Sequence, residues 1–242
     1  MHPTLPQDSL ARPKPQPGGP IDGGTWPSQI TANVVESGPP ARIHGYEVEG
    51  DLAVNYRFTD LVLLSLLGEL PDEPASRAFD LALQLLAPID VTAGPAHVAV
   101  LARICGVKSA SAIAVTALAL GEQSCHLIAE HADWLAWLAA PTGEVPARFL
   151  AGYADERSAA ARLAAAVEAT GLAVPALRAG PTRAAALLAI LHACGLGRPE
   201  QVEAALVLAR LSCALAESFA AGIGAFATYP MQLPPYRHEV TP

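Results

Sequence analysis

The segment at residues 56–70, YRFTDLVLLSLLGEL, constrains the fold most, because it predicts one almost wholly apolar helix. Thr59 is a good N-cap, since its hydroxyl can accept a hydrogen bond from a backbone N–H at the helix start, and Asp60 is favourable in the first turn. Gly68 is expected to end the helix. A helix that is apolar on all sides belongs in the middle of a helical protein, and this one is far too short to span a bilayer.

The composition indicates an all-α protein. Hydrophobic residues make up 52% of the chain and aromatic residues only 5%, because Ala and Leu, which favour helices, are so frequent. With 242 residues the chain can bury a sizeable core as one domain, or as one large and one small lobe. The formal net charge of −8, without a cluster of Lys or Arg, argues against nucleic acid and against an anionic membrane surface as partners.

The cysteines and the N-terminus indicate a cytoplasmic protein. Four cysteines occur, at Cys105, Cys125, Cys194 and Cys213. Their wide spacing within apolar stretches fits neither a zinc site nor a disulfide scaffold, so we interpret them as buried thiols. The chain opens with polar and proline-rich residues instead of the basic and then apolar run of a signal peptide, so a cytoplasmic location is expected.

Local signals divide the chain into a tail, a ribbon and a series of helices. Residues 1–25 are rich in Pro and Gly and are expected to form a disordered tail. Two β-prone pieces, 29–35 and 42–48, flank a turn at 37–40. Helices are predicted at 73–87, 95–105, 109–120, 126–139, 156–170, 182–194 (with Thr182 as its cap) and 199–222. Residues 229–242 are not expected to be helical.

Several of these segments resemble the citrate synthase and citryl-CoA lyase family. Residues 56–71 resemble its SFTDLVYLLLLGELP stretch, WPSQIT at 26–31 and ARIHGYEV at 41–48 resemble its N-terminal ribbon, and 94–121 and 204–217 resemble two of its helices. The resemblance implies a homodimeric all-α fold that closes over an acyl-CoA and a keto acid. It implies a large domain (26–140 and 195–242) and a small domain (141–194), the latter shortened in this chain.

The standard catalytic groups of that family, two histidines and one aspartate, are missing here. Ser124 stands at the place of the first histidine, with His126 two residues later, and Arg148 stands at the place of the second. The aspartate would fall within residues 182–185, which contain no carboxylate. The resemblance therefore implies a divergent member of the family, whose usual proton-moving groups have been replaced.

Two arginines match the residues with which the family binds the carboxylates of its organic acid. They are Arg157 and Arg210, and a guanidinium suits this role because it is always charged and forks onto a carboxylate. We expect the two to meet across one hollow. Arg210 is the stronger candidate, because it lies within an apolar helical stripe where an unpaired charge would be costly.

The first hypothesis for function is an enzyme of the lyase or acyltransferase type. It would perform carbonyl-adjacent chemistry (C–C bond cleavage or formation, decarboxylation or enolisation) on a small carboxylic acid or an acyl-CoA thioester. His126 would act as acid and base, oriented by Glu122 one turn earlier, and Arg148 would stabilise developing negative charge. Ser124 would contact the substrate. No metal is expected, because His126 and His131, five positions apart, lie on different helix faces.

The second hypothesis is a non-catalytic metabolite-binding or regulatory subunit on the same fold, paired with itself or with a homologous subunit. Loss of all three catalytic groups favours it, and the two arginines favour binding without deciding whether turnover follows. Simpler explanations also remain. His126 with Glu122 fits a solvent-facing helix pair, and Arg148 and Arg157 fit surface arginines.

Overall fold

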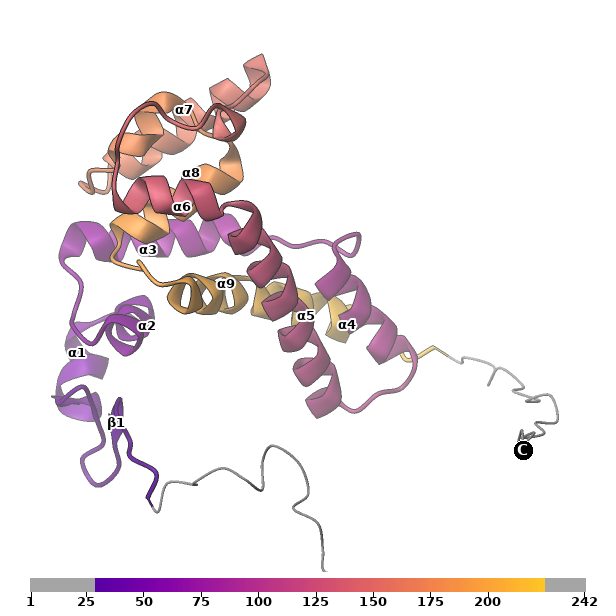
Figure 1. Ribbon diagram of the computed structural model, residues 1–242. Coiled ribbons are helices and arrows are strands. Elements are labelled where there is room, and N and C mark those ends of the chain that lie inside the picture. The colour runs from indigo at the N-terminus through magenta and orange to yellow at the C-terminus, as the bar shows by residue number, and fades with distance from the viewer. Residues whose placement is uncertain (1–28, 225–242) are drawn as a thin grey trace, which may run out of the picture. The chain divides into compact units, whose positions relative to one another are not determined.

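The computed structural model describes residues 29–224, and these residues are mostly helical, with one small sheet (Figure 1). Every element described below lies in one compact unit, which begins at Val34. The all-α prediction is confirmed. The tails predicted at 1–25 and 229–242 lie outside the described residues. The division into a large and a shortened small domain stays a prediction.

The N-terminal ribbon is a small three-stranded antiparallel sheet. Its strands, in the order β1-β2-β3, are β1 (Val35–Glu36), β2 (Arg42–Ile43) and β3 (Tyr46–Glu47). The predicted piece 42–48 is a hairpin, because His44 and Gly45 both have positive φ, at 47° and 86°, and reverse the chain. The predicted piece 29–35 is wrong except at its last residue, since 29–34 form no strand.

Helix α2 (Phe58–Leu67) confirms the predicted helix and its end, but its start differs from the prediction. Gly68 ends it in the left-handed region at φ 88°. The N-cap is Arg57, whose backbone N–H donates to the Asp60 carboxylate over 2.9 Å. The hydroxyl of Thr59 is buried and has no hydrogen-bond partner among residues 29–224. The carboxylate was the better acceptor because it reaches back one turn to the first free N–H.

Burial of α2 is one-sided. Leu63 and Leu64 are fully buried, whereas Phe58 is 69% exposed. The predicted burial on all sides is therefore wrong at the N-terminal end. Asp60 is buried with them, and its carboxylate also accepts from the hydroxyl of Ser76 on the following helix, so that two donors compensate the buried charge.

Seven longer helices make up the rest. They are α3 (Glu73–Leu86), α4 (Gly94–Ile104), α5 (Ser109–Glu130), α6 (Ala132–Ala139), α7 (Ala154–Glu168), α8 (Arg183–Ala193) and α9 (Pro199–Ala220). Short helical turns precede α2 (Val48–Leu52, then α1 at Ala53–Asn55) and flank α7 (Ala147–Phe149 and Pro175–Ala179). The predicted cap of α8 is confirmed, since the Thr182 hydroxyl accepts from the backbone N–H of Ala185.

Helix α5 corrects the prediction of two helices separated near Gly121. It runs unbroken for 22 residues, and the break comes only at His131 (Figure 1). Gly121 faces α9, where an added Cβ would lie 3.5 Å from a carboxylate oxygen of Glu203. Packing along a neighbouring helix outweighs the weak helix propensity of a single glycine.

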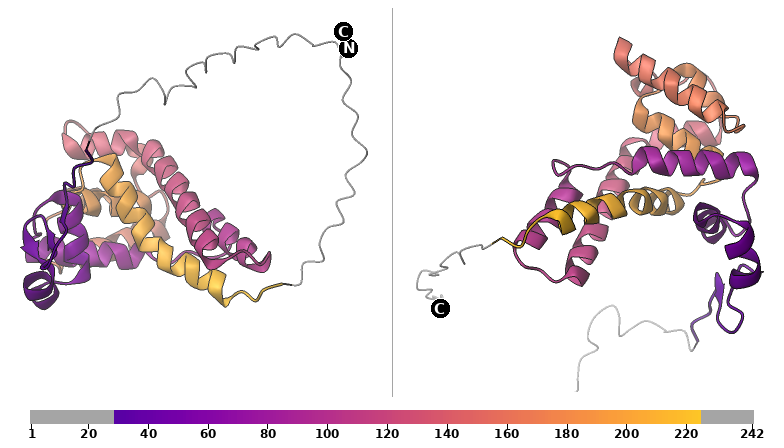
Figure 2. Two further views of the ribbon diagram at one scale, coloured as in Figure 1. Left: turned by 90° about the horizontal axis from the view of Figure 1, so that it is seen from below. Right: turned by 180° about the vertical axis from the view of Figure 1, so that it is seen from behind.

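The core forms where α9 and α8 pack against the other helices. Helix α9 contacts α4, α5 and α3, and α8 contacts α3, α6 and α7 (Figure 2). Trp134 of α6 is fully buried, and its indole N–H donates to the carbonyl of Ala185 over 2.8 Å. At the two ends of α9, Gln201 donates to the carbonyl of Leu66 and Ser218 to that of Ala99, each over 2.8 Å. These bonds fix α9 to α2 and to α4.

The cysteines depart from the expectation of four buried thiols. Only Cys194 is fully buried, whereas Cys105 and Cys125 are exposed.

Within residues 29–224, α5 is the one helix long and apolar enough to cross a membrane, although the packed helices of globular proteins often meet this criterion too. Here α5 packs along both α4 and α9, but only 22% of its apolar stretch is buried, so packing among residues 29–224 covers little of it.

Candidate functional site

Four helices surround a hollow of about 340 Å³, which we call the apolar hollow. It is lined by the end of α3, the second half of α5, the first half of α8 and the middle of α9. Most of its wall consists of leucines: Leu85, Leu86, Leu127, Leu187, Leu188 and Leu206. Two arginines, Arg183 and Arg210, complete the lining together with Pro88 and Ala184. An apolar cavity with a few convergent polar groups is the usual form of a small-molecule site.

Arg210 lies partly buried on α9 and donates from Nη1 to Oε1 of Gln123 on α5 over 3.0 Å. Burial lowers the pKa of the Arg210 guanidinium, which nonetheless stays charged at any physiological pH. Within residues 29–224 no carboxylate oxygen lies within 4.0 Å of it. A guanidinium has five N–H donors, so most of those of Arg210 remain available to an anion.

Arg183 is the first residue of α8, and its Nη2 donates to the carbonyl of Leu85 over 2.8 Å. Leu85 belongs to the last turn of α3, whose carbonyls have no partner within their own helix. The bond therefore ties the two helices together and holds the guanidinium at the hollow. Arg183 also lies within 182–185, the stretch where the resemblance places the catalytic aspartate of the family. An arginine therefore occupies the region in which that carboxylate is expected.

A second, more polar hollow of about 200 Å³ adjoins the first and shares Pro88 and Arg210 with it. We call it the polar hollow, and Asp90 and Gln123 contribute its other polar groups. The Asp90 carboxylate accepts hydrogen bonds from the hydroxyl and the backbone N–H of Thr92, and these bonds hold its pKa below the usual value. Arg210 thus lies between an apolar hollow and one that carries a negative charge.

The predicted acid–base pair lies away from both hollows. The side chain of His126 is 74% exposed, and its Nε2 lies 3.2 Å from Oε1 of Glu130. The expected pairing with Glu122 is wrong, because the imidazole turns toward the C-terminal end of α5. Glu122 instead lines a separate groove between α5 and α9.

The other predicted residues also lie outside the hollows. Arg148 forms an ion pair with Asp133 over 2.7 Å and stacks over the Phe149 ring. Arg157 is exposed and donates to the carbonyl of Gly152, so the structure shows no common hollow for Arg157 and Arg210. Ser124 is fully buried, and its hydroxyl has no partner among the described residues. Of the six predicted residues, Arg210 alone lines either hollow.

Sequence reasoning missed Arg183 and Asp90. The available signal for Arg183 was a single charge at the start of RAAALLAIL, an otherwise wholly apolar helix. Such a charge must either face solvent or find a partner. For Asp90 the signal was the Asp-Val-Thr sequence, which is typical of a turn in which the carboxylate accepts from the backbone two residues later.

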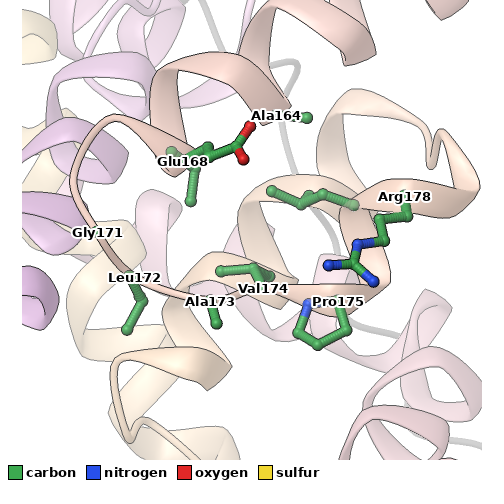
Figure 3. A pocket seen from close by; sticks show the side chains of 10 residues that line it. Ala164, Glu168, Gly171, Leu172, Ala173, Val174, Pro175 and Arg178 are labelled. Carbon is green, nitrogen blue, oxygen red and sulfur yellow. The ribbon is translucent and has the colours of Figure 1, made fainter.

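A third hollow, of about 290 Å³, lies between the end of α7 and the turn at Pro175–Ala179. Figure 3 shows Glu168 and Arg178 on different sides of it, and Leu172, Val174 and Pro175 also line it. Both charged residues are exposed, so water already solvates them and neither requires a ligand. The partly buried Arg210 makes the two adjoining hollows the stronger candidate. Within residues 29–224 no three His, Cys, Asp or Glu side chains gather as a metal site.

The fold is similar to that of two solved lyases. No protein-family model matches the chain, and no curated protein matches it. The structure of citryl-CoA lyase from Hydrogenobacter thermophilus aligns with a TM-score of 0.61 and 16% identity over 88% of this chain and 95% of that one. ATP citrate lyase from Methanothrix soehngenii, solved with citrate and coenzyme A, aligns with a TM-score of 0.54 and 12% identity over 91% of this chain and 43% of its own. The chain therefore has the citrate synthase-like helical fold.

Proposed function

We propose that this protein binds a small carboxylic acid, or an acyl-CoA derived from one, at Arg210 and Arg183, as a non-catalytic metabolite-binding or regulatory subunit. The observation that carries the proposal is the charge of the site. Two arginines line one hollow, the partly buried Arg210 and the exposed Arg183, and neither guanidinium has a carboxylate oxygen within 4.0 Å among residues 29–224. The similar structures support it, because one is a citryl-CoA lyase and the other was solved with citrate and coenzyme A.

A bound anion would neutralise the charge of Arg210, which no carboxylate of residues 29–224 neutralises. A partly buried cation without a counter-ion is unfavourable, whereas a carboxylate that accepts two N–H bonds from a guanidinium is among the stronger polar contacts in proteins. Gln123 already holds Arg210 in place through the 3.0 Å bond, so little side-chain entropy is lost on binding.

Among residues 29–224, the side chains that line the two hollows include no strong base near neutral pH, which supports binding without catalysis. The apolar hollow is lined by leucines, Pro88, Ala184 and the two arginines, none of which exchanges a proton near neutral pH. Asp90 in the polar hollow is a weak base, because the bonds from Thr92 hold its pKa low. His126 is outside both hollows.

A second candidate function is a lyase or acyltransferase of the citrate synthase type. The observation in its favour is that Asp90 and Arg210 line the same polar hollow. A carboxylate could remove a proton next to a carbonyl while the guanidinium stabilises the enolate oxygen, as acid–base and electrostatic catalysis require. In this function Asp90 would replace His126 as the group that moves the proton.

Calorimetric titration of the full chain with citrate and with short-chain acids and their CoA thioesters tests the binding proposal. Arg210→Gln should abolish binding, and Arg183→Gln should weaken it at least tenfold, since a charged hydrogen bond of about 1.5–3 kcal/mol is lost. Arg157→Gln is the matched control, an exposed arginine away from the hollows, and should change nothing. Loss of binding in the control alone, or no binding by the parent protein, would refute the proposal.

Exchange of the α-protons of each bound acid or thioester with D2O, followed by NMR, separates the two functions. The non-catalytic subunit should give no exchange above the protein-free rate. Exchange that disappears in Asp90→Asn but persists in His126→Ala would establish the enzyme instead. Exchange that depends on His126 would restore the acid–base role expected for it from the sequence.

We also propose that two copies associate along the groove between α5 and α9. The groove, about 610 Å³, is lined mainly by apolar residues, among them Leu118, which is 66% exposed. Glu122, Glu200 and Glu203 also line the groove, so its apolar residues, and not charge pairing, would hold two copies together. Sedimentation analysis should give a dimer for the parent chain and a monomer for Leu118→Asp. A monomeric parent would refute self-association and would favour a homologous subunit as the partner.

A further inference from the structure

We infer that the ligand is a monocarboxylic acid with an apolar chain, whose carboxylate is held by Arg210 and Arg183 while the chain lies among the leucines of the apolar hollow. The inference rests on the proposed carboxylate site and adds the class of ligand. This class of ligand differs from citrate, because a tricarboxylate has several charged groups and no apolar chain.

The lining of the hollow favours a chain over a second charged group. Six of its ten lining residues are leucines, and they come from all four helices: α3, α5, α8 and α9. A carboxylate placed against these side chains would lose its water without gaining a hydrogen bond, which is strongly unfavourable. Methylene groups in the same place gain free energy, because apolar surface leaves water.

The donors of the site also suit one carboxylate better than three. Arg210 already uses one N–H on Gln123, and Arg183 uses one on the carbonyl of Leu85. On the other side of Arg210, the polar hollow carries the negatively charged Asp90. A second or third carboxylate that extended into the polar hollow would be repelled by Asp90. A ligand with one negative end and one apolar end avoids both unfavourable environments.

The volume of the apolar hollow sets the length of the hydrocarbon chain of the ligand. The apolar hollow measures about 340 Å³. At the ~30 Å³ that a water molecule occupies in the liquid, this volume corresponds to roughly ten non-hydrogen atoms. A straight acid of about eight carbons would fill it. Affinity should therefore rise along the series up to about octanoate and then stop rising.

Titration of the full chain with acetate, butyrate, hexanoate, octanoate and decanoate measures this directly. Each methylene that enters the hollow should tighten binding about fourfold, from ~0.8 kcal/mol per buried methylene. Citrate should bind more weakly than hexanoate. Octan-1-ol, which has the chain without the charge, should bind at least tenfold more weakly than octanoate. An affinity that does not change with chain length, or citrate binding more tightly than octanoate, would overturn the inference.

Two substitutions test where the hydrocarbon chain of the ligand lies within the protein. Ala184→Leu adds bulk to the wall of the hollow at a half-buried helical position, so octanoate should lose its advantage while acetate binds as before. Ala173→Leu adds the same bulk at an exposed position in the separate hollow beside α7 and should leave the octanoate affinity unchanged. The reverse result would place the hydrocarbon chain of the ligand in that hollow and refute the assignment. Thermal melting of each variant verifies that it folds, and Leu127→Ala offers a second test, since the enlarged hollow should prefer decanoate.

The outcomes separate this inference from the proposal on which it rests. If citrate binds more tightly than any monocarboxylate and Arg210→Gln abolishes that binding, the carboxylate site stands and the apolar ligand is wrong. If no acid binds, the carboxylate site itself is wrong. If octanoate binds equally to the parent and to Arg210→Gln, only the hydrocarbon chain is recognised, and both the carboxylate site and the inferred ligand are wrong.

Discussion

The guanidinium of Arg210 donates to the side-chain oxygen of Gln123 over 3.0 Å, and within residues 29–224 this is its only side-chain partner. The bond joins α9 to α5 at the boundary between the apolar and the polar hollow. An amide supplies a dipole but no charge, so the contact orients the guanidinium without neutralising it. A site built in this way is positioned before the anion arrives.

Without ligand, Arg210 should therefore lower the stability of the fold. Arg210→Met keeps a long side chain and removes the partly buried charge, so the free energy of unfolding should rise, by about 1 kcal/mol. Urea denaturation without added acid measures the change. Arg157→Met, in which an exposed arginine is replaced, should change it by less than about 0.5 kcal/mol. A clear loss of stability in Arg210→Met would mean that the charge is already compensated.

The buried carboxylate of Asp60 should depend on Ser76. Ser76→Ala removes the hydroxyl that donates to Asp60 and should destabilise the protein by about 1–3 kcal/mol, because a buried charge loses one of its two donors. Thr59→Val is the matched control one residue away. Its hydroxyl is buried without a partner in the described part of the chain, so the substitution should be neutral or stabilising. Equal losses in the two variants, measured by urea denaturation, would contradict the assigned bond.

The continuity of α5 can be tested at Gly121. Because Gly121 lies within the helix and an added Cβ would meet ordinary contact distances, Gly121→Ala should stabilise the protein by about 0.5–1 kcal/mol. Gly106 is the contrasting glycine. It has φ 77°, so Gly106→Ala should destabilise the protein. Thermal unfolding of both variants decides the question, and a destabilised Gly121→Ala would indicate the helix break expected from the sequence.

Stability should fall at high pH through Cys194. Burial raises the pKa of this thiol to about 12 from the model-compound value of 9.0. Between these values the unfolded chain has lost the proton and the folded chain keeps it. The stabilisation is therefore complete below pH 9 and is lost as the pH rises toward 12, with a slope of about 1.4 kcal/mol per pH unit.

Urea denaturation from pH 8 to pH 11 of the parent and of Cys194→Ala isolates this contribution. The difference in stability between the two should shrink as the pH rises. A thiol reagent at pH 8 provides a second check, since it should modify Cys105 in the folded protein and Cys194 only after unfolding. Rapid labelling of Cys194 under native conditions would contradict the burial.

Local signals predicted most of the secondary structure. The Thr182 cap of α8 and the left-handed Gly68 at the end of α2 each depend on neighbouring residues, so the sequence contains the information needed. The gap predicted between the helices at 109–120 and 126–139 is wrong, because the helical state of this stretch depends on α9, about 80 residues later in the chain. The overall fold followed from a resemblance spread over many segments, which does not depend on any single boundary.

The candidate site was harder to predict, because its contacts join distant segments. Arg183 donates to Leu85, 98 positions earlier, and Arg210 to Gln123, 87 positions earlier. The resemblance suggested Arg157 by motif, but α7 begins in an exposed loop where that guanidinium bonds to its own turn. His126 was given the partner one turn before it, although helical spacing equally allows Glu130, one turn after. Only the packing of the helices distinguishes these alternatives.

The unbroken course of α5 restricts how its gene can change. One codon inserted between those for Leu118 and Gln123 would rotate everything downstream by about 100°, because each helical residue advances the chain by that angle. The amide that orients Arg210 would then point elsewhere, while Leu118 kept its place on the surface. Homologous proteins that bind the same ligand should therefore differ within this stretch only by substitutions. Insertions and deletions should occur in the loops before and after α5.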